Sequence, residues 1–294
     1  MRHLITLAIQ FLSILPFWFF YGISDFLFIV MFYITKYRRK IVGMNLAHAF
    51  PEKPNGELRQ IEKAFYRHLA DYLVETVAVF HMHVRDFDER YRFTNPEVLD
   101  KYARSGTNVL LAPGHYGNWE WFSCLILRIK FQCLAIYKEQ SSQFTNEMIL
   151  RSRGKYGLTM LRYHEAYKYL LTYHGNLPVC LFFLADQRPP TNKKVSWIPF
   201  LNQTTAAFRG LENLHQKMNG AVLYVHLRKT KRGYYDVTFI PLNCPEEPEP
   251  SVDLMLNYFH ELEKNILENP SYYLWSHKRW KFIPPVNTSD GYAN

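Results

Sequence analysis

A histidine and a glutamate five residues apart, His115 and Glu120, stand in the stretch VLLAPGHYGNWEWF at residues 109–122. A carboxylate that holds one ring nitrogen of a histidine leaves the other nitrogen free to take a proton from a hydroxyl group, so this pair could act as a general base. The stretch has no Ser or Cys in a GxSxG arrangement. Direct attack by a substrate hydroxyl is therefore more economical than a covalent enzyme intermediate.

The spacing alone is a weak signal. With 12 His and 26 acidic residues among 294 positions, about one His-x4-acid match is expected by chance. Two further matches occur, His81 with Asp86 and His83 with Asp88, and they fall in a charged run that favours a solvent-exposed helix end. His115 differs because it follows a strongly apolar run and a glycine, and ligands gather at the carboxyl ends of strands in open α/β sheets.

A turn between His115 and Glu120 would bring the two side chains together. On one continuous helix, residues five apart diverge by about 140°. Gly114 and Gly117 give the backbone freedom for a turn, and Asn118 is a candidate N-cap that would place Glu120 in the first helical turn. We therefore expect the carboxylate of Glu120 to hold Nδ1 of His115, with Nε2 facing a substrate.

The rest of the chain alternates between short apolar runs and helical patterns. The apolar runs predict strands at 109–112, 133–137, 179–185, 221–227 and 235–240. The helical patterns lie near 58–80, 119–129, 142–156, 165–173, 206–218 and 251–268. This alternation predicts an α/β fold with a central, mostly parallel mixed sheet flanked by helices. The last two strands, with TKRG at their tip, predict a hairpin that forms an antiparallel edge.

The N-terminal segment is apolar over residues 4–35, which is longer than the roughly 20 residues that cross a bilayer. Pro16, Gly22, Ser24 and Asp25 are expected to break it into two halves. Basic residues cluster at 36–40, and by the positive-inside tendency they place the globular part in the cytoplasm. We predict a membrane-anchoring segment at 1–40 and a catalytic domain at 41–294. A spanning helix, an interfacial hairpin and a buried helical pair all stay open.

Charge and cysteine usage narrow the class of partner. The net charge of +9 and an aromatic share of 17% suit anionic lipid headgroups or an acidic protein. The sequence has no Cys/His finger and no aromatic RNA-binding signature, so nucleic acid is not expected as a partner. Four cysteines at 124, 133, 180 and 244 have no CxxC spacing, which predicts reduced thiols and no cysteine metal site.

Several stretches together carry a family resemblance. They are NLAHAFPEK at 45–53, GHYGNWE at 114–120, RSRGKYG at 151–157, LADQRPP at 184–190 and NPSYYLWSHKRWK at 269–281. In order and spacing the chain resembles the glycerolipid/lysophospholipid acyltransferase superfamily, and within it the late (secondary) acyltransferases of lipid A. The resemblance implies a membrane-associated O-acyltransferase on the cytoplasmic side of the cell inner membrane. The enzyme would move a fatty acyl chain from acyl carrier protein to a hydroxyl of a lipid A precursor, without a metal or other cofactor.

The resemblance also implies roles for individual residues. His115 would be the base and Glu120 its orienting acid, Arg153 would face an anionic acceptor, and Asp186 would close a strand end beside the active site. Asn118 is predicted to contact the substrate. From the residues alone, Arg153 on a solvated helix face and Asp186 as a loop cap stay open.

Two stretches have a role that the sequence leaves open, and three other functions are also compatible with it. The stretch WSHKRWK at 275–281 could be an interfacial patch or a tether for the tail, and PFLNQTTAAFRG at 199–210 departs from the Phe-Gly pair expected after PF. The first alternative function is an acyltransferase for a lysophospholipid, glycolipid or amino-acid lipid, using acyl carrier protein or acyl-CoA. The others are a metal-dependent hydrolase with His115, Glu120 and Asp186 as ligands, and a non-catalytic protein that binds anionic lipid.

Overall fold

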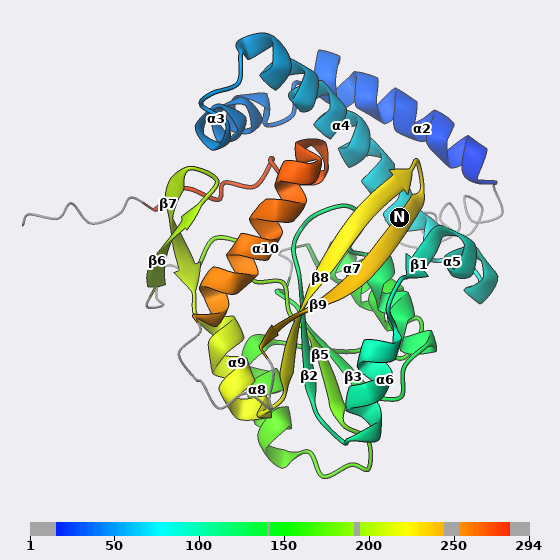
Figure 1. Cartoon of the computed structure of the whole chain (residues 1–294). Coiled ribbons are helices and arrows are strands. Elements are labelled where there is room, and N and C mark those ends of the chain that lie inside the picture. Colours follow the sequence, from blue (N-terminus) through cyan, green and yellow to red (C-terminus); the bar gives the residue numbers. More distant parts are fainter. Residues whose placement is uncertain (1–15, 140–141, 191–194, 244–252, 283–294) are drawn as a thin grey trace, which may run out of the picture.

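A seven-stranded sheet forms the centre of the protein (Figure 1). The computed structural model describes residues 16–139, 142–190, 195–243 and 253–282. In spatial order the strands are β1 (Tyr91–Phe93), β9 (Tyr234–Asn243), β8 (Ala221–Lys231), β2 (Val109–Pro113), β5 (Val179–Phe182), β3 (Gln132–Ile136) and β4 (Thr159–Leu161). Neighbouring strands run parallel except for the antiparallel pair β8 and β9.

Helices cover both faces of this sheet, as the α/β prediction requires. In Figure 1, α10 lies in front of the sheet and α7 lies behind it. The helices after the N-terminal region are α4 (Asn55–Ala78), α5 (Val84–Arg90), α6 (Glu97–Arg104), α7 (Gln143–Gly154), α8 (Tyr163–Thr172), α9 (Gly210–Met218) and α10 (Leu254–Glu268), with the 3₁₀ turns η2 (Trp121–Leu127) and η3 (Pro270–Tyr272). Every residue of β2 and β5 is buried, as expected for strands covered on both faces. The predicted fold class is therefore confirmed.

Three local predictions differ from the structure. The hairpin of β8 and β9 is not the sheet edge, because β1 pairs in parallel with the outer side of β9. The helix expected near 119–129 is the shorter 3₁₀ turn η2. The helix expected over 206–218 begins only at Gly210, because the preceding residues form a separate antiparallel hairpin of β6 (Val195–Phe200) and β7 (Gln203–Phe208). That hairpin contains most of the stretch that departs from the expected Phe-Gly pair.

The described part of the N-terminal segment is one continuous helical rod. It consists of α2 (Phe17–Ile29) followed by the π-helical turn η1 (Val30–Ile34), and α3 (Arg39–Ala49) comes next. Gly22, Ser24 and Asp25 do not interrupt α2, so the break predicted at these three residues is wrong. The first residues of the segment, 4–15, lie outside the described residues. By length and hydropathy, Phe17–Ile34 is a helix that could cross a membrane.

Candidate active site

His115 lies in the loop that leaves the carboxyl end of β2. The backbone of the C-terminal tail fixes this loop, because Leu274 N donates to His115 O at 3.1 Å and Gly117 N donates to Tyr272 O at 3.0 Å. Gly117 adopts a φ of +61°, and a Cβ atom there would meet the side chain of Leu227. The turn at this point therefore requires glycine.

The imidazole of His115 is held by Asp186. Its Nδ1 lies 2.6 Å from Asp186 Oδ1, and the backbone N of His115 donates to Asp186 Oδ2 at 3.0 Å. Burial alone would raise the pKa of the Asp186 carboxyl, but the charge and the hydrogen bonds of His115 hold that pKa below its ordinary value. An ionised carboxylate that accepts from the backbone and the ring fixes both the orientation and the tautomer of the histidine.

The other ring nitrogen is available at the surface. Nε2 of His115 lies 2.9 Å from the side-chain amide nitrogen of Gln187, an exposed residue. With the proton on Nδ1, Nε2 accepts from this amide. The ring of Trp119 stands edge-on to the imidazole with centroids 5.1 Å apart. A hydroxyl group that displaced Gln187 would meet the basic lone pair of Nε2.

Sheet topology explains why Asp186 and not a nearer acid reaches His115. Strands β2 and β5 are parallel neighbours, and Leu111 is paired with Phe182. His115 follows Leu111 by four residues and Asp186 follows Phe182 by four residues. The two chains therefore leave the sheet side by side, and residues 71 apart in sequence meet at the same strand ends.

Glu120 makes a different contact from the predicted one. Instead of holding His115 Nδ1, it binds Arg153 in a bidentate pair, with Nε to Oε2 at 2.8 Å and Nη2 to Oε1 at 2.7 Å. Its Oε1 also accepts from Tyr72 OH and from the indole of Trp119, each at 3.1 Å. Burial alone would raise the pKa of Glu120, but the charge and hydrogen bonds of Arg153 keep it below its ordinary value.

Arg153 is therefore occupied by Glu120 and only partly exposed, with 21% of its side chain accessible. The pair borders a narrow cleft of about 30 Å³ with mostly apolar walls. This space holds about one water molecule. The sequence left open that Arg153 only solvates a helix face without a role in the site. The bidentate pair with Glu120 excludes this.

Asn118 supports the loop from inside. None of it is exposed, its amide donates to Glu75 Oε2 at 2.7 Å, and its Oδ1 accepts from Trp121 N at 3.2 Å. The second bond resembles an N-cap contact, but η2 begins only at Trp121 with Glu120 as its N-cap residue, so the predicted N-cap position of Asn118 is wrong. In this structure the side chain has no surface left for the predicted substrate contact.

The tail segment at 275–281 is a tether. Trp275, Ser276 and Arg279 are buried, and His277 Nε2 accepts from Arg188 N at 3.1 Å. Burial lowers the pKa of His277 to about 4, consistent with a neutral ring that accepts a hydrogen bond. The tail thus holds the loop after Asp186, and the alternative of an exposed interfacial patch is wrong for these three buried residues.

Sequence reasoning missed Tyr72, Trp119 and Gln187. Gln187 stands directly after Asp186 in LADQRPP, which was a usable signal because that stretch follows a buried strand. Tyr72 comes from the middle of α4, a helix whose apolar stripe gives no sign that one phenol reaches Glu120. Only the packing of α4 against the site loop shows that contact.

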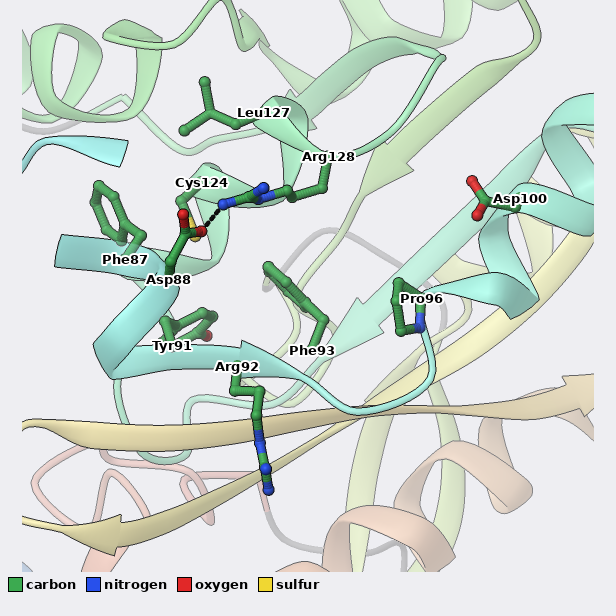
Figure 2. A pocket seen from close by; sticks show the side chains of 10 residues that line it. All are labelled: Phe87, Asp88, Tyr91, Arg92, Phe93, Pro96, Asp100, Cys124, Leu127 and Arg128. Atoms are coloured by element: carbon green, nitrogen blue, oxygen red, sulfur yellow. Dashed lines mark ion pairs between the residues drawn. The ribbon is translucent and has the colours of Figure 1, made fainter. Parts of the chain in front are cut away.

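A second hollow lies between α5, β1, α6 and η2 (Figure 2). Its volume is about 350 Å³, and an ion pair of Asp88 with Arg128 spans part of its wall. None of the predicted site residues lines it. Cys124, which does, is buried, and burial raises the pKa of its thiol. It therefore lacks the lowered pKa of a reactive thiolate.

The described residues also bear on the metal alternative. Within 16–139, 142–190, 195–243 and 253–282, no three His, Cys, Asp or Glu side chains gather as a metal ligand set would. His115 and Asp186 are bonded to each other, and Glu120 is bonded to Arg153. Within the described part of the chain, His115 and Asp186 thus lie together but Glu120 does not complete a set of three metal ligands with them.

A family model described as bacterial lipid A biosynthesis acyltransferase matches residues 2–282. No curated protein matches the chain.

Proposed function

The chain belongs to the bacterial lipid A biosynthesis acyltransferase family, and on that premise we propose that it transfers a fatty acyl chain from acyl carrier protein to a hydroxyl of a lipid A precursor. The enzyme is an acyltransferase of lipid A biosynthesis. The observation that carries the mechanism is the His115–Asp186 pair at the ends of β2 and β5, with Nε2 turned outward.

In the proposed reaction His115 acts as general base. Nε2 takes the proton of the acceptor hydroxyl while the hydroxyl oxygen attacks the carbonyl carbon of the donor thioester. The tetrahedral intermediate collapses, the C–S bond breaks, and the imidazolium returns the proton to the leaving sulfur. Asp186 stays ionised throughout and stabilises the imidazolium, as the acid does in hydrolase triads. The products are an ester and a free thiol, and no covalent enzyme intermediate is required.

Glu120 then acts through position and charge. Its bond to the Trp119 indole and its pair with Arg153 hold the aromatic wall beside the imidazole. Asp186 is the carboxylate that contacts the histidine, whereas the charge of Glu120 is balanced by Arg153. Arg153 keeps one face toward the cleft, and we propose that it meets an anionic group of the acceptor when the cleft widens.

The donor is proposed to be acyl carrier protein because an acidic protein suits a surface of net charge +9. Acyl-CoA as donor, and another lipid as acceptor, remain the alternative. The apolar rod Phe17–Ile34 and the basic residues after it support attachment to the cytoplasmic side of the inner membrane, because the anionic lipids of that leaflet attract basic segments. We likewise keep residues 1–40 as the proposed anchoring segment and 41–294 as the catalytic domain.

The deciding experiment compares total lipids from cells with the protein, without it and with His115→Ala. We expect mass spectrometry to show one lipid A species that gains an ester-linked chain only with the active protein. The purified enzyme is then given acyl carrier protein thioester or acyl-CoA in separate reactions. Gain of the chain on a different lipid, or transfer from acyl-CoA alone, would replace the acceptor or donor proposed here.

A further inference from the structure

The rod formed by α2 and η1 packs along its whole length against α4. Tyr21 OH donates to Glu75 at 3.1 Å, and Ser24 Oγ donates to Asp71 at 2.7 Å. One turn further on, the guanidinium of Arg67 lies 5.1 Å from the ring centroid of Phe28.

The same packing continues to the end of the rod, where the rings of Phe32 and Tyr66 have centroids 5.5 Å apart. As the rod advances from residue 21 to 32, its partners on α4 descend from 75 to 66. The two helices are therefore antiparallel neighbours, as Figure 1 shows.

This packing conflicts with a membrane-crossing helix. An 18-residue rod is about 27 Å long, close to the roughly 30 Å of a hydrocarbon core. If it crossed, α4 would enter the hydrocarbon beside it, together with Asp71, Glu75 and Arg67. Charged groups are strongly unfavourable at that depth. Breaking the contacts instead would expose the buried side of α4 and leave Asp71 without its Ser24 partner.

The other side of the rod is apolar and uncovered. We define the outer stripe as Trp18, Phe26, Ile29 and Tyr33, which are 74%, 63%, 48% and 52% exposed. Helical spacing places this stripe opposite the buried residues Phe20, Ser24, Phe28 and Phe32. An aromatic stripe of this kind along a helix marks an interaction site.

Basic side chains flank the stripe at both ends of the rod. Lys36 and Lys40 are exposed after its carboxyl end, and exposed Lys231 stands at the hairpin tip beside its amino-terminal half. The tip is docked on α2, because Arg232 binds Asp25 at 2.7 Å and thereby neutralises the one acidic residue of the rod. Apolar rings between cations match the headgroup layer of an anionic bilayer.

We propose that Phe17–Ile34 lies in the plane of an anionic membrane surface, with the outer stripe inserted among the lipids, and does not cross the bilayer. The proposal rests on the proposed function in one respect, namely that a lipid acceptor requires the protein to meet a membrane. The tests below measure membrane position and binding, and they do not depend on acyl transfer. Residues before 16 play no part in it.

This orientation would also serve the active site. A hollow of about 450 Å³ lies between Met31 and Tyr37 at the end of the rod and Leu69, Leu274 and His277 on the domain side. Leu69 and Leu274 also line a smaller hollow whose walls include Trp119, the neighbour of His115. This smaller hollow has a volume of only about 10 Å³, so a lipid acceptor would reach the imidazole from this side only after its walls moved apart.

The orientation is tested by spin labels on the full chain in vesicles of phosphatidylcholine and phosphatidylglycerol. Trp18→Cys, Phe26→Cys, Ile29→Cys and Tyr33→Cys are each made with Cys244→Ser, since Cys124, Cys133 and Cys180 are buried. For an in-plane rod all four labels lie at one depth, about 5–10 Å below the headgroups. For a crossing rod, positions 18 and 33 are separated by about 22 Å along the membrane normal. A depth that runs through the bilayer centre would overturn the proposal.

Vesicle binding gives an independent measurement. Phe26→Glu should weaken binding at least about tenfold, because an inserted ring is lost and a negative charge is added. Leu171→Glu on α8 is the matched control, since Leu171 is 58% exposed, and it should bind as the wild type does. Thermal unfolding is measured for both. Three results would reject a membrane as the partner of the outer stripe. They are an equal loss of binding in both variants, no vesicle binding by the wild type, and a dimer that Phe26→Glu dissociates while vesicle binding persists.

Discussion

Asp186→Asn is the substitution that most directly separates the structure from the sequence-based assignment of Glu120 as the orienting acid. The carboxylate of Asp186 accepts from the backbone N of His115 and from its Nδ1. An asparagine has one acceptor and one donor for these two positions. The backbone N–H cannot change its role, so the amide oxygen must face it and the amide N–H must face Nδ1. The imidazole would then carry its proton on Nε2 and could not accept one from the substrate.

The expected loss follows from that tautomer. A triad histidine held in the wrong tautomer loses about 10⁴-fold in turnover in the known hydrolase case. We expect a fall in kcat of about 10³- to 10⁴-fold, which is roughly 4–5.5 kcal/mol of barrier. The assay is transfer of a labelled acyl chain from acyl carrier protein to a lipid A precursor at saturating substrate. Gln187→Ala is the control, because it removes only the partner of Nε2, and it should stay within about tenfold of wild type.

The comparison that would refute this reasoning uses Glu120→Gln. That variant leaves both bonds of Asp186 to His115 in place, so its loss of activity should be smaller than that of Asp186→Asn. It should also lower the thermal stability, because Arg153 would lose a buried charged partner. Near wild-type turnover of Asp186→Asn, with a thousandfold loss for Glu120→Gln, would identify Glu120 as the acid that serves the base.

Three further outcomes are expected. His115→Ala should lower acyl transfer by about 10²- to 10⁴-fold without unfolding the protein. His83→Ala should remain active. Kinetics of both variants check this, and a larger loss for His83→Ala than for His115→Ala would mean that the wrong histidine was chosen. Arg153→Ala should raise the KM of the acceptor more than that of the donor, and an unchanged acceptor KM would reject its anion-binding role. Burial lowers the pKa of His277 from 6.5 to about 4, so its contribution to stability is present above pH 6.5 and is lost as the pH falls toward 4. His277→Gln should flatten the free energy of unfolding over that interval in denaturant titrations, and an unchanged slope would contradict the shift.

The sheet was predictable because its signals are local. Apolar runs such as Val109–Pro113 and Val179–Phe182 are buried on both faces, and such strands are recognisable from composition alone. The hairpin of β6 and β7 was missed because its residues, including Pro199, Gln203 and Thr204–Thr205, give no apolar alternation. A two-stranded ribbon outside the main sheet is specified by its contacts with α10 and the tail more than by its own sequence.

The N-terminal rod shows a different limit. Gly22, Ser24 and Asp25 are polar or flexible residues that usually interrupt an apolar helix, and the sequence therefore predicted a break. In the structure Ser24 and Asp25 bind Asp71 and Arg232, which are distant in the chain. Tertiary partners thus satisfy the polar groups and the helix continues through them. Local propensity could not show this, because both partners come from other elements.

The contact predicted between Glu120 and His115 does not form, for a reason that is general to parallel sheets. Nearness in sequence favoured Glu120, five residues from His115, yet the chain turns through Gly117 and points that side chain toward Arg153 instead. The residue that meets His115 is set by which strand lies beside β2, and strand order is a long-range property of the whole sheet. Once β5 is known to be the neighbour, the equal offset of four residues after Leu111 and Phe182 places Asp186 at the imidazole. A search for acids that follow apolar strands, rather than for acids near the histidine, would have ranked Asp186 alongside Glu120. Function at such a site therefore depends on strand adjacency, and substitutions that shift the β2–β5 register should abolish activity even when every site residue is retained.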